Sequence, residues 1–317
     1  MVLMVLSILT VVTILFFLFR LVPGGPMAAI MSPRMSPEAQ QRVIEEFGLN
    51  EPLWKQYLLY MQNVLQLDFG QSFYYGDSVT GIIADRFIST MSLMLTAFLI
   101  SYTIGVYLGA QLGWLRGTTR ERAGMLAVLL IRSTPVFWTG MIVLYLFAFQ
   151  LNLFPLGGMR SVTANYSGQF DKLLHPDFLY HLALPVFTLC TYYTGLPLLL
   201  MRNNLLEILS EDYIDTARAK GLSDRRILFH HAARNAILPV VTAFAIAIGF
   251  AVGGQVLIET VFSWPGLGRE MVKASLRSDY PVAQGAFTLL SVIVITMNFV
   301  ADLAYTYLDP RVRLGGT

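Results

Sequence analysis

Charged side chains are scarce in this sequence. Asp, Glu, Lys and Arg make up 13% of its 317 residues, against roughly 25% in soluble globular proteins, and hydrophobic residues make up 55%. The mean hydropathy is +0.59. A single soluble domain is therefore disfavoured, and a protein that crosses a membrane several times is favoured. The net charge of +2, with no basic run flanked by aromatic residues, gives no argument for a nucleic-acid partner.

Cysteine, lysine and histidine are also rare. The only cysteine, Cys190, lies in an apolar stretch and excludes a disulfide within the chain. No lysine follows a glycine, so the Gly-Lys-Ser/Thr loop that binds nucleotide phosphates is absent from the sequence. The histidines form no His-Glu-x-x-His pair, and no serine or carboxylate pair at membrane depth has an obvious base, which argues against an intramembrane protease. We therefore expect no catalytic residue and no metal or cofactor bound by this chain.

Long hydrophobic runs are abundant. A helix needs about 20 apolar residues to cross the hydrocarbon layer. Six stretches qualify: residues 2–19, 93–113, 124–151, 179–201, 237–258 and 286–304. The first is expected to be a retained helix, because it lacks the basic start and the small-residue cleavage site of a signal peptide. The predicted fold is an all-α integral membrane protein with six transmembrane helices, which places both termini on the same side.

The distribution of Lys and Arg orients these helices. Basic residues are denser in the side that holds residues 114–123, 202–236 and the C-terminal tail, so this side and both termini are predicted to be cytoplasmic. The predicted organisation is a first membrane helix (1–19), an outer loop (20–92) and a membrane core (93–317). Within the outer loop, patterns predict short helices over 36–48 and 53–65. They either cap the bundle or form a docking surface for an external partner.

One polar segment interrupts the hydrophobic core, over residues 211–239. Ser210 is a candidate N-cap for a helix whose first turn carries acidic residues, and Gly221 is expected to end that helix. Ser223 is a candidate cap for a second helix that runs toward Pro239. Ile214, Ala217 and Gly221 fall on one face, where small residues would let another surface approach closely.

This segment carries a family resemblance. Asp215-Thr216-Ala217, followed after three residues by Gly221, is similar to the EAA loop of ABC-importer permeases, and residues 216–223 resemble the form found in the dipeptide/oligopeptide/nickel permease family. Other motifs resemble the same family in order along the chain: those at 21–26, 47–49, 68–72, 135–138, 231–236, 262–269, 279–282 and 309–313. In that family, a long outer loop marks the first of the two permease subunits.

The resemblance implies a membrane subunit of an ATP-driven importer in the inner membrane of a prokaryote. Its EAA helix would sit in a cleft of a cytoplasmic ATPase, and the implied coupling residues are Tyr213, Asp215, Thr216, Ala217, Arg218, Lys220 and Gly221. The implied partners are a second homologous permease subunit, two ATPase subunits or domains that hold ATP and Mg²⁺, and an extracytoplasmic substrate-binding protein. Peptides are the commonest substrates of the family. Short oligosaccharides, nickel chelates and glutathione are the alternatives.

Polar and small residues near membrane depth give further candidates. The candidates for a transport path or gate are Arg132, Pro135, Tyr192, Gln255, Glu259 and Trp264. Pro135 is expected to kink its helix, and Glu259 and Trp264 are expected at the outer mouth, where they would gate entry or touch a delivery protein. Ala245, Gly249 and Gly253 form a ladder of small residues suited to close helix packing. An ion-coupled carrier is disfavoured, because Arg132 and Asp302 lie near predicted helix ends and no internal repeat is visible.

Overall fold

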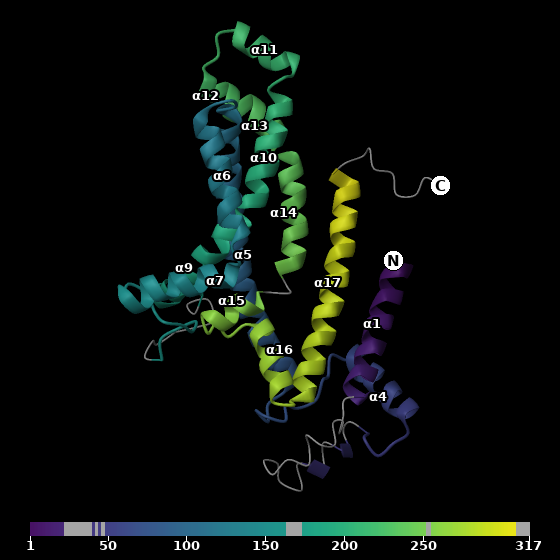
Figure 1. Cartoon of the computed structure of the whole chain (residues 1–317). Coiled ribbons are helices and arrows are strands. Elements are labelled where there is room, and N and C mark those ends of the chain that lie inside the picture. Colours follow the sequence, from purple (N-terminus) through teal and green to yellow (C-terminus); the bar gives the residue numbers. More distant parts are fainter. Residues whose placement is uncertain (22–39, 42–43, 46–47, 163–172, 252–254, 309–317) are drawn as a thin grey trace. The chain divides into compact units, whose positions relative to one another are not determined.

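A computed structural model of the chain describes residues 1–21, 40–41, 44–45, 48–162, 173–251 and 255–308. Over these residues the chain is built from helices, with a single isolated β-bridge between Gln71 and Ser78, so the all-α prediction is confirmed (Figure 1). The helices are α1 (Val2–Leu21), α4 (Leu53–Leu65), α5 (Val79–Trp114), α6 (Thr119–Ser133), α7 (Val136–Val143), the π-helix η1 (Leu144–Gln150), α9 (Pro176–Tyr193), α10 (Gly195–Ile208), α11 (Asp212–Ala219), α12 (Asp224–Arg226), the π-helix η2 (Ile227–Ala232), α13 (Ala233–Ala236), α14 (Leu238–Ala251), α15 (Val256–Val261), α16 (Leu267–Leu276) and α17 (Tyr280–Leu308).

Four helical stretches are long and apolar enough to cross a membrane. They are α1, α5, the run Pro176–Ile208 that joins α9 to α10, and residues Tyr280–Val300 of α17. Two further stretches pass the same test only as bent pairs: Thr119–Ser133 with Val136–Gln150, bent by 93°, and Asp224–Ala236 with Leu238–Gly249, bent by 51°. The protein is thus multi-spanning as predicted, and the count reaches six when each bent pair is one span.

The sharpest bend lies at Pro135. The pyrrolidine ring disfavours helical backbone at the preceding residue, and Thr134 accordingly is extended, with ψ 138°. Pro135 is itself extended, with ψ 127°, and stands immediately before α7. The predicted kink is confirmed, and it is a complete break between α6 and α7.

Several predicted boundaries change. Helix α5 begins at Val79, so the last part of the predicted 20–92 loop is helical. The predicted helix over 237–258 is wrong as one element, because α14 ends at Ala251 and α15 is a separate helix. The predicted helix over 53–65 is confirmed as α4. The other predicted helix of the outer loop falls mostly outside the described residues, although Gly48 at its expected end has φ +57°.

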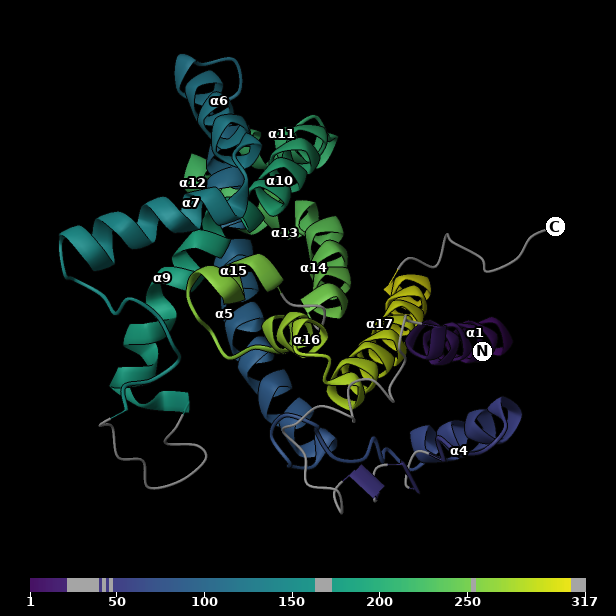
Figure 2. The same ribbon diagram turned by 60° about the horizontal axis from the view of Figure 1, so that its bottom comes forward.

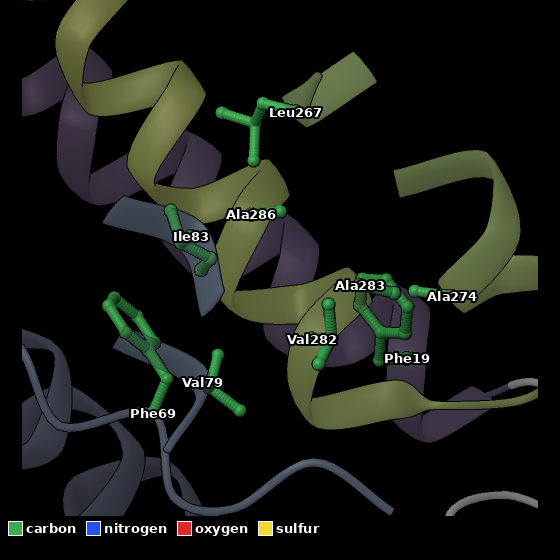
Figure 3. Packing of buried hydrophobic residues seen from close by; sticks show 9 residues of the cluster. All are labelled: Phe19, Phe69, Val79, Ile83, Leu267, Ala274, Val282, Ala283 and Ala286. Atoms are coloured by element: carbon green, nitrogen blue, oxygen red, sulfur yellow. The ribbon is translucent and has the colours of Figure 1, made fainter. Parts of the chain in front are cut away.

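Of the described residues, the first of two compact units contains 1–21, 40–41, 44–45, 48–91, 255–259 and 265–299. Its core joins side chains from distant parts of the sequence, drawn in Figure 3: Phe19, Phe69, Val79, Ile83, Leu267, Ala274, Val282, Ala283 and Ala286. Polar pairs fix the same elements, since Arg20 Nε donates to Gln56 Oε1 at 2.8 Å and Tyr60 Oη bonds Thr288 Oγ1 at 2.8 Å. The predicted division into residues 1–19, 20–92 and 93–317 stays a prediction.

Of the described residues, the second unit contains 92–162, 173–251, 260–264 and 300–308. A row of glycines on α5 lets α10 approach closely. A Cβ on Gly105 would lie 2.6 Å from Pro197 Cγ, one on Gly109 2.5 Å from the backbone oxygen of Leu198, and one on Gly113 2.9 Å from a Leu205 methyl group. Helix α10 continues toward α11, and α10, α11 and α13 are grouped in both views (Figure 1 and Figure 2).

Candidate functional site

Helix α11, Asp212–Ala219, is the centre of the polar segment. Its N-cap is Glu211, and no side chain caps it; Ser210 Oγ instead donates to the Glu207 carbonyl at 2.6 Å, so the predicted Ser210 cap is wrong. Asp212 and Asp215 place negative charge in the first turn, where the exposed backbone N–H groups favour it. The helix ends at Ala219, and Gly221 follows it with φ +72°, a left-handed conformation that favours glycine.

The small-residue face of α11 is turned inward. Ile214 is 0% exposed and Ala217 6% exposed, and α11 contacts η2 of the same chain. The part of the predicted face formed by Ile214 and Ala217 packs on the chain itself, whereas Gly221 is exposed, so the approach of another surface at this face stays a prediction. The other implied coupling residues are exposed, namely Tyr213, Asp215, Thr216, Arg218, Lys220 and Gly221. The surface that α11 offers to a partner is polar and carries both signs of charge.

Hydrogen bonds tie α11 to the helices that lead back toward the apolar core. Asn235 Nδ2 donates to Tyr213 Oη at 2.9 Å, which joins α11 to α13. Asn204 Nδ2 donates to the Ala236 carbonyl at 3.3 Å, which joins α10 to the same helix. Because α13 continues into α14 through the 51° bend, a displacement of α11 can be transmitted through the Asn235–Tyr213 hydrogen bond and α13 to α14.

A second polar cluster joins α6 to α10 and was missed at the sequence level. Both Nε and Nη2 of Arg202 bond Glu121 Oε1, the first at 3.1 Å, and the Gly117 N–H donates to Glu121 Oε2 at 2.7 Å. Thr118 caps α6 by accepting from the Glu121 N–H. The spacing Thr118-x-x-Glu121 is that of a capping box and could have predicted the helix start, although not the arginine partner.

The predicted path residues differ in their burial and in their neighbours. Arg132 is exposed, and its stem lies over Gly195, where an added Cβ would be 3.1 Å from Arg132 Cδ. Tyr192 is 37% exposed and packs edge-on against Tyr193. Trp264 is 0% exposed, with its ring 5.9 Å from that of Phe178. Trp264 thus lies in a packed core and cannot touch a delivery protein in this structure.

The remaining packing and path candidates lie on α14, immediately before α15, or outside the described residues. Ala245 is partly buried and Gly249 buried on α14, whereas Gly253 lies outside the described residues. Gln255 is partly buried immediately before α15. The close glycine contacts found for α5 were not predicted, although their i, i+4 spacing is readable in the sequence.

Glu259 is fully buried and acts as a cap for α16. Its carboxylate accepts from Thr90 Oγ1 at 2.7 Å and from the Arg269 N–H at 2.8 Å, while Thr90 Oγ1 accepts from the Leu267 N–H. Burial raises the pKa of the Glu259 carboxyl, and the hydrogen bonds from Thr90 and the backbone oppose that rise. A Cβ on Gly266 would lie 2.2 Å from the carboxyl carbon, so glycine is required there. The gating role expected of Glu259 stays a prediction, and in this structure its carboxylate is buried.

Another buried carboxylate fixes the loop that precedes α5. Asp279, 2% exposed, accepts from Ser72 Oγ, from the Phe73 N–H at 3.0 Å and from the Tyr74 N–H at 3.3 Å. Two of the sequence motifs, at 68–72 and 279–282, are thus in direct contact. Each is needed to build the turn.

Comparison with known proteins gives the family. A model of the inner membrane component of binding-protein-dependent transport systems matches residues 101–314, and a model of the N-terminal part of such membrane components matches residues 1–94. The chain is 36% identical to a di/tripeptide transport system permease protein of Pseudomonas aeruginosa and 36% identical to an oligopeptide transport system permease protein of Bacillus subtilis, over 93% of this chain and 91% of each relative. It is 34% identical to a dipeptide transport system permease protein of Escherichia coli K12, over 92% of this chain and 91% of that protein.

The fold has a solved counterpart. The inward-facing MetNI methionine ABC transporter contains a chain that matches 72% of this protein and 96% of its own length, with a TM-score of 0.56 and 17% identity. That likeness supports the helical architecture alone. The family matches show that this multi-pass membrane chain belongs to the inner membrane components of binding-protein-dependent ABC transport systems.

Proposed function

We propose that this chain is the non-catalytic, first permease subunit of an ATP-driven importer of di- or oligopeptides. Its partners are a second homologous permease subunit, two cytoplasmic ATPase subunits or domains that bind ATP and Mg²⁺, and an extracytoplasmic binding protein. Both termini and α11 lie on the cytoplasmic side. The peptide specificity rests on the relatives, whose names specify di/tripeptides, oligopeptides and dipeptides.

The observation that carries the coupling role is the construction of α11. A short helix with an apolar face packed on its own chain and a polar face exposed can transmit force, because its buried side fixes it to η2 and α13. Closure of the ATPases would grip Tyr213, Asp215, Thr216, Arg218 and Lys220 on the exposed side. Ala217 would act through packing and would not touch the ATPase.

The turn at Gly221 gives a sharp test of this role. Gly221→Pro cannot adopt φ +72°, because the proline ring holds φ near −65°. We expect this change to abolish ATP-dependent uptake of a labelled dipeptide in proteoliposomes that contain the complete transporter. Gly221→Asn is the matched control, because asparagine tolerates the left-handed region and should retain most of the uptake.

A parallel pair probes the buried face. Ala217→Leu should displace α11 from η2 and so uncouple ATP hydrolysis from uptake. Thr216→Leu changes an exposed neighbour, so it should preserve the packing of α11 on η2 and weaken only the binding of the ATPase. Normal dipeptide uptake by both Gly221→Pro and Ala217→Leu would refute the coupling assignment. A wild-type transporter that accumulates a labelled oligosaccharide or nickel chelate, and no peptide, would refute the substrate assignment.

A further inference from the structure

Helix α6 lies along α10, and the two helices run in opposite directions. Gly195, the first residue of α10, lies against the second half of α6, where an added Cβ would be 3.1 Å from Arg132 Cδ and 3.7 Å from Val128 Cγ1. Glu121, in the first turn of α6, bonds Arg202 in the second half of α10. The two helices are therefore in contact at both ends, through packing at one end and through charge at the other.

These contacts constrain α10 to different degrees. Gly195, like Gly109 and Gly113 of α5, brings side-chain stems and backbone together without a directional bond, and helices packed in this way can slide past one another. Within the described part of the chain, the hydrogen bonds that join α10 to α5 and α6 are those from Arg202 Nε and Nη2 to Glu121 Oε1. A planar guanidinium that uses two nitrogens fixes an orientation as well as a distance. The Arg202–Glu121 ion pair thus sets the register of α10 against α6.

The carboxylate of Glu121 is also fixed from its own side. The Gly117 N–H donates to Glu121 Oε2 at 2.7 Å, and Thr118 Oγ1 accepts from the Glu121 N–H at 3.3 Å. Glu121 is 6% exposed and the Arg202 side chain 24% exposed, so both charges are largely removed from water. The cost of that desolvation offsets much of the attraction between them, so net stability is a weak explanation for the ion pair. Fixing a register is the better-attested use of a buried polar pair.

Helix α10 leads directly into α11. Backbone hydrogen bonds continue through the connection, since the Ser210 N–H donates to the Glu207 carbonyl at 3.1 Å and the Glu211 N–H to the Ile208 carbonyl at 3.1 Å. A displacement of α11 therefore reaches α10 through the main chain, by a route separate from the one through α13. Arg202 lies on this route, and its ion pair connects the route to α6.

We propose that Glu121 and Arg202 are positioning residues for the coupling step, which hold α6 to α10 so that α6 moves with α11 when the ATPases close. The inference rests on the proposed function, because that function assigns α11 to the ATPase. Without the ion pair, α10 would slide along its glycine contacts, and only part of the displacement of α11 would reach α6. More ATP would then be hydrolysed for each peptide imported.

A double replacement separates register from stability. Glu121→Gln can still accept from the Gly117 N–H, and Arg202→Met keeps an unbranched stem. Because the two changes together remove both charges, the complete transporter in nanodiscs should assemble and unfold thermally as the wild type does. In proteoliposomes, the amount of labelled dipeptide imported per ATP hydrolysed should fall by about fivefold or more.

Two single variants complete the comparison. Arg202→Met alone leaves the Glu121 carboxylate buried without its cation, so it should lower the unfolding temperature. Arg122→Met removes an exposed cation from the same helix and is the matched control. It should keep both the wild-type unfolding temperature and the wild-type import per ATP.

A spin-label measurement tests the movement itself. Nitroxide labels are attached at Arg120→Cys on α6 and at Glu211→Cys, the N-cap of α11, in a Cys190→Ala background; positions 120 and 211 are both exposed. Pulsed electron paramagnetic resonance gives the distance between the labels in the complete transporter, without nucleotide and with ATP and vanadate. With the ion pair intact we expect one distance in both states, and in the double variant we expect a distance that changes or broadens.

The outcomes distinguish this inference from the proposed function. A distance that changes between the two states while the ion pair is intact would overturn the positioning role, and so would normal import per ATP in the double variant. Either result leaves the proposed function in place, provided that the wild type imports the dipeptide. A transporter that gives the expected distances and imports no peptide would instead refute the substrate assignment and support the positioning role.

Discussion

At the scale of single residues, two buried carboxylates do the most to shape the first unit. Glu259 and Asp279 both accept hydrogen bonds from backbone N–H groups and from a hydroxyl group. A buried acceptor of this kind is costly to remove, because its donors are left without partners. Both residues are recognisable in the sequence as acids beside motifs, but their partners are far away in the chain.

The contribution of Asp279 can be measured by an isosteric change. Asp279→Asn keeps the shape but replaces an acceptor oxygen with an N–H₂ group that faces other donors. We expect a loss of about 1–3 kcal/mol in the free energy of unfolding. Thermal unfolding of the purified protein in detergent checks the stability, and chymotrypsin cleavage at Phe73 or Tyr74 should become faster.

The matched control for that change is Asp77→Asn, in the same loop. The Asp77 side chain is exposed, and what the loop uses is its backbone carbonyl, which accepts from the Ser72 N–H at 2.9 Å. This variant should unfold and be cleaved like the wild type. Equal stability of Asp279→Asn and Asp77→Asn would show that the carboxylate does not hold the loop.

At the scale of elements, glycine spacing on α5 determines how close α10 can come. Gly109→Ala would place a methyl group 2.5 Å from the Leu198 backbone oxygen, and a helix backbone cannot move aside as a side chain can. We expect a loss of about 1–3 kcal/mol in stability, measured by the temperature at which the detergent-solubilised protein aggregates.

Gly81→Ala is the control on the same helix. A Cβ there meets nothing within 4 Å, and alanine is favoured over glycine by up to about 1 kcal/mol in a helix. This variant should be as stable as the wild type or more so. If Gly109→Ala and Gly81→Ala behave alike, α5 and α10 are not closely packed in the native protein.

The same elements show what a single sequence can predict. The existence of α4 and α11, the turn at Gly221 and the break at Pro135 follow from local backbone rules, and all were predicted. Which small residues let two helices pack closely was not predicted: a ladder was expected at Ala245, Gly249 and Gly253, whereas the close contacts between α5 and α10 involve Gly105, Gly109 and Gly113. Spacing alone identifies a face on which a helix can pack closely but does not identify the partner helix.

The buried side of α11 illustrates the same limit. A face of Ile214 and Ala217 suits a partner protein and suits the chain's own η2 equally well, because both choices bury the same apolar area. Only the path of the chain after Gly221 decides between them. The coupling role of the residues around α11 therefore stays a prediction, and the structure adds that Ala217 is buried.

At the scale of the whole molecule, the sequence predicted a multi-spanning helical chain, and its order of motifs predicted the family. It did not predict that residues 265–299 join the N-terminal residues in one compact unit. That grouping depends on contacts between segments about 200 residues apart, such as Ser72 with Asp279 and Tyr75 with Glu270. Periodicity and composition carry no information on such pairs.

The sidedness of the chain gives the last prediction. The wild type is a nearly silent background for thiol labelling, because its single cysteine, Cys190, is only 9% exposed. Thr216→Cys places a thiol on the exposed face of α11, and Ser275→Cys places one on the exposed face of α16. The bent pair Asp224–Ala236 and Leu238–Gly249 is a candidate span between these two positions, and basic residues favour the cytoplasm around α11. A membrane-impermeant maleimide should therefore label Ser275→Cys in intact cells and Thr216→Cys only after permeabilisation. Labelling of both thiols from the same side would mean that α14 does not cross the membrane, and labelling in the reverse order would place the coupling surface outside the cell, out of reach of any ATPase.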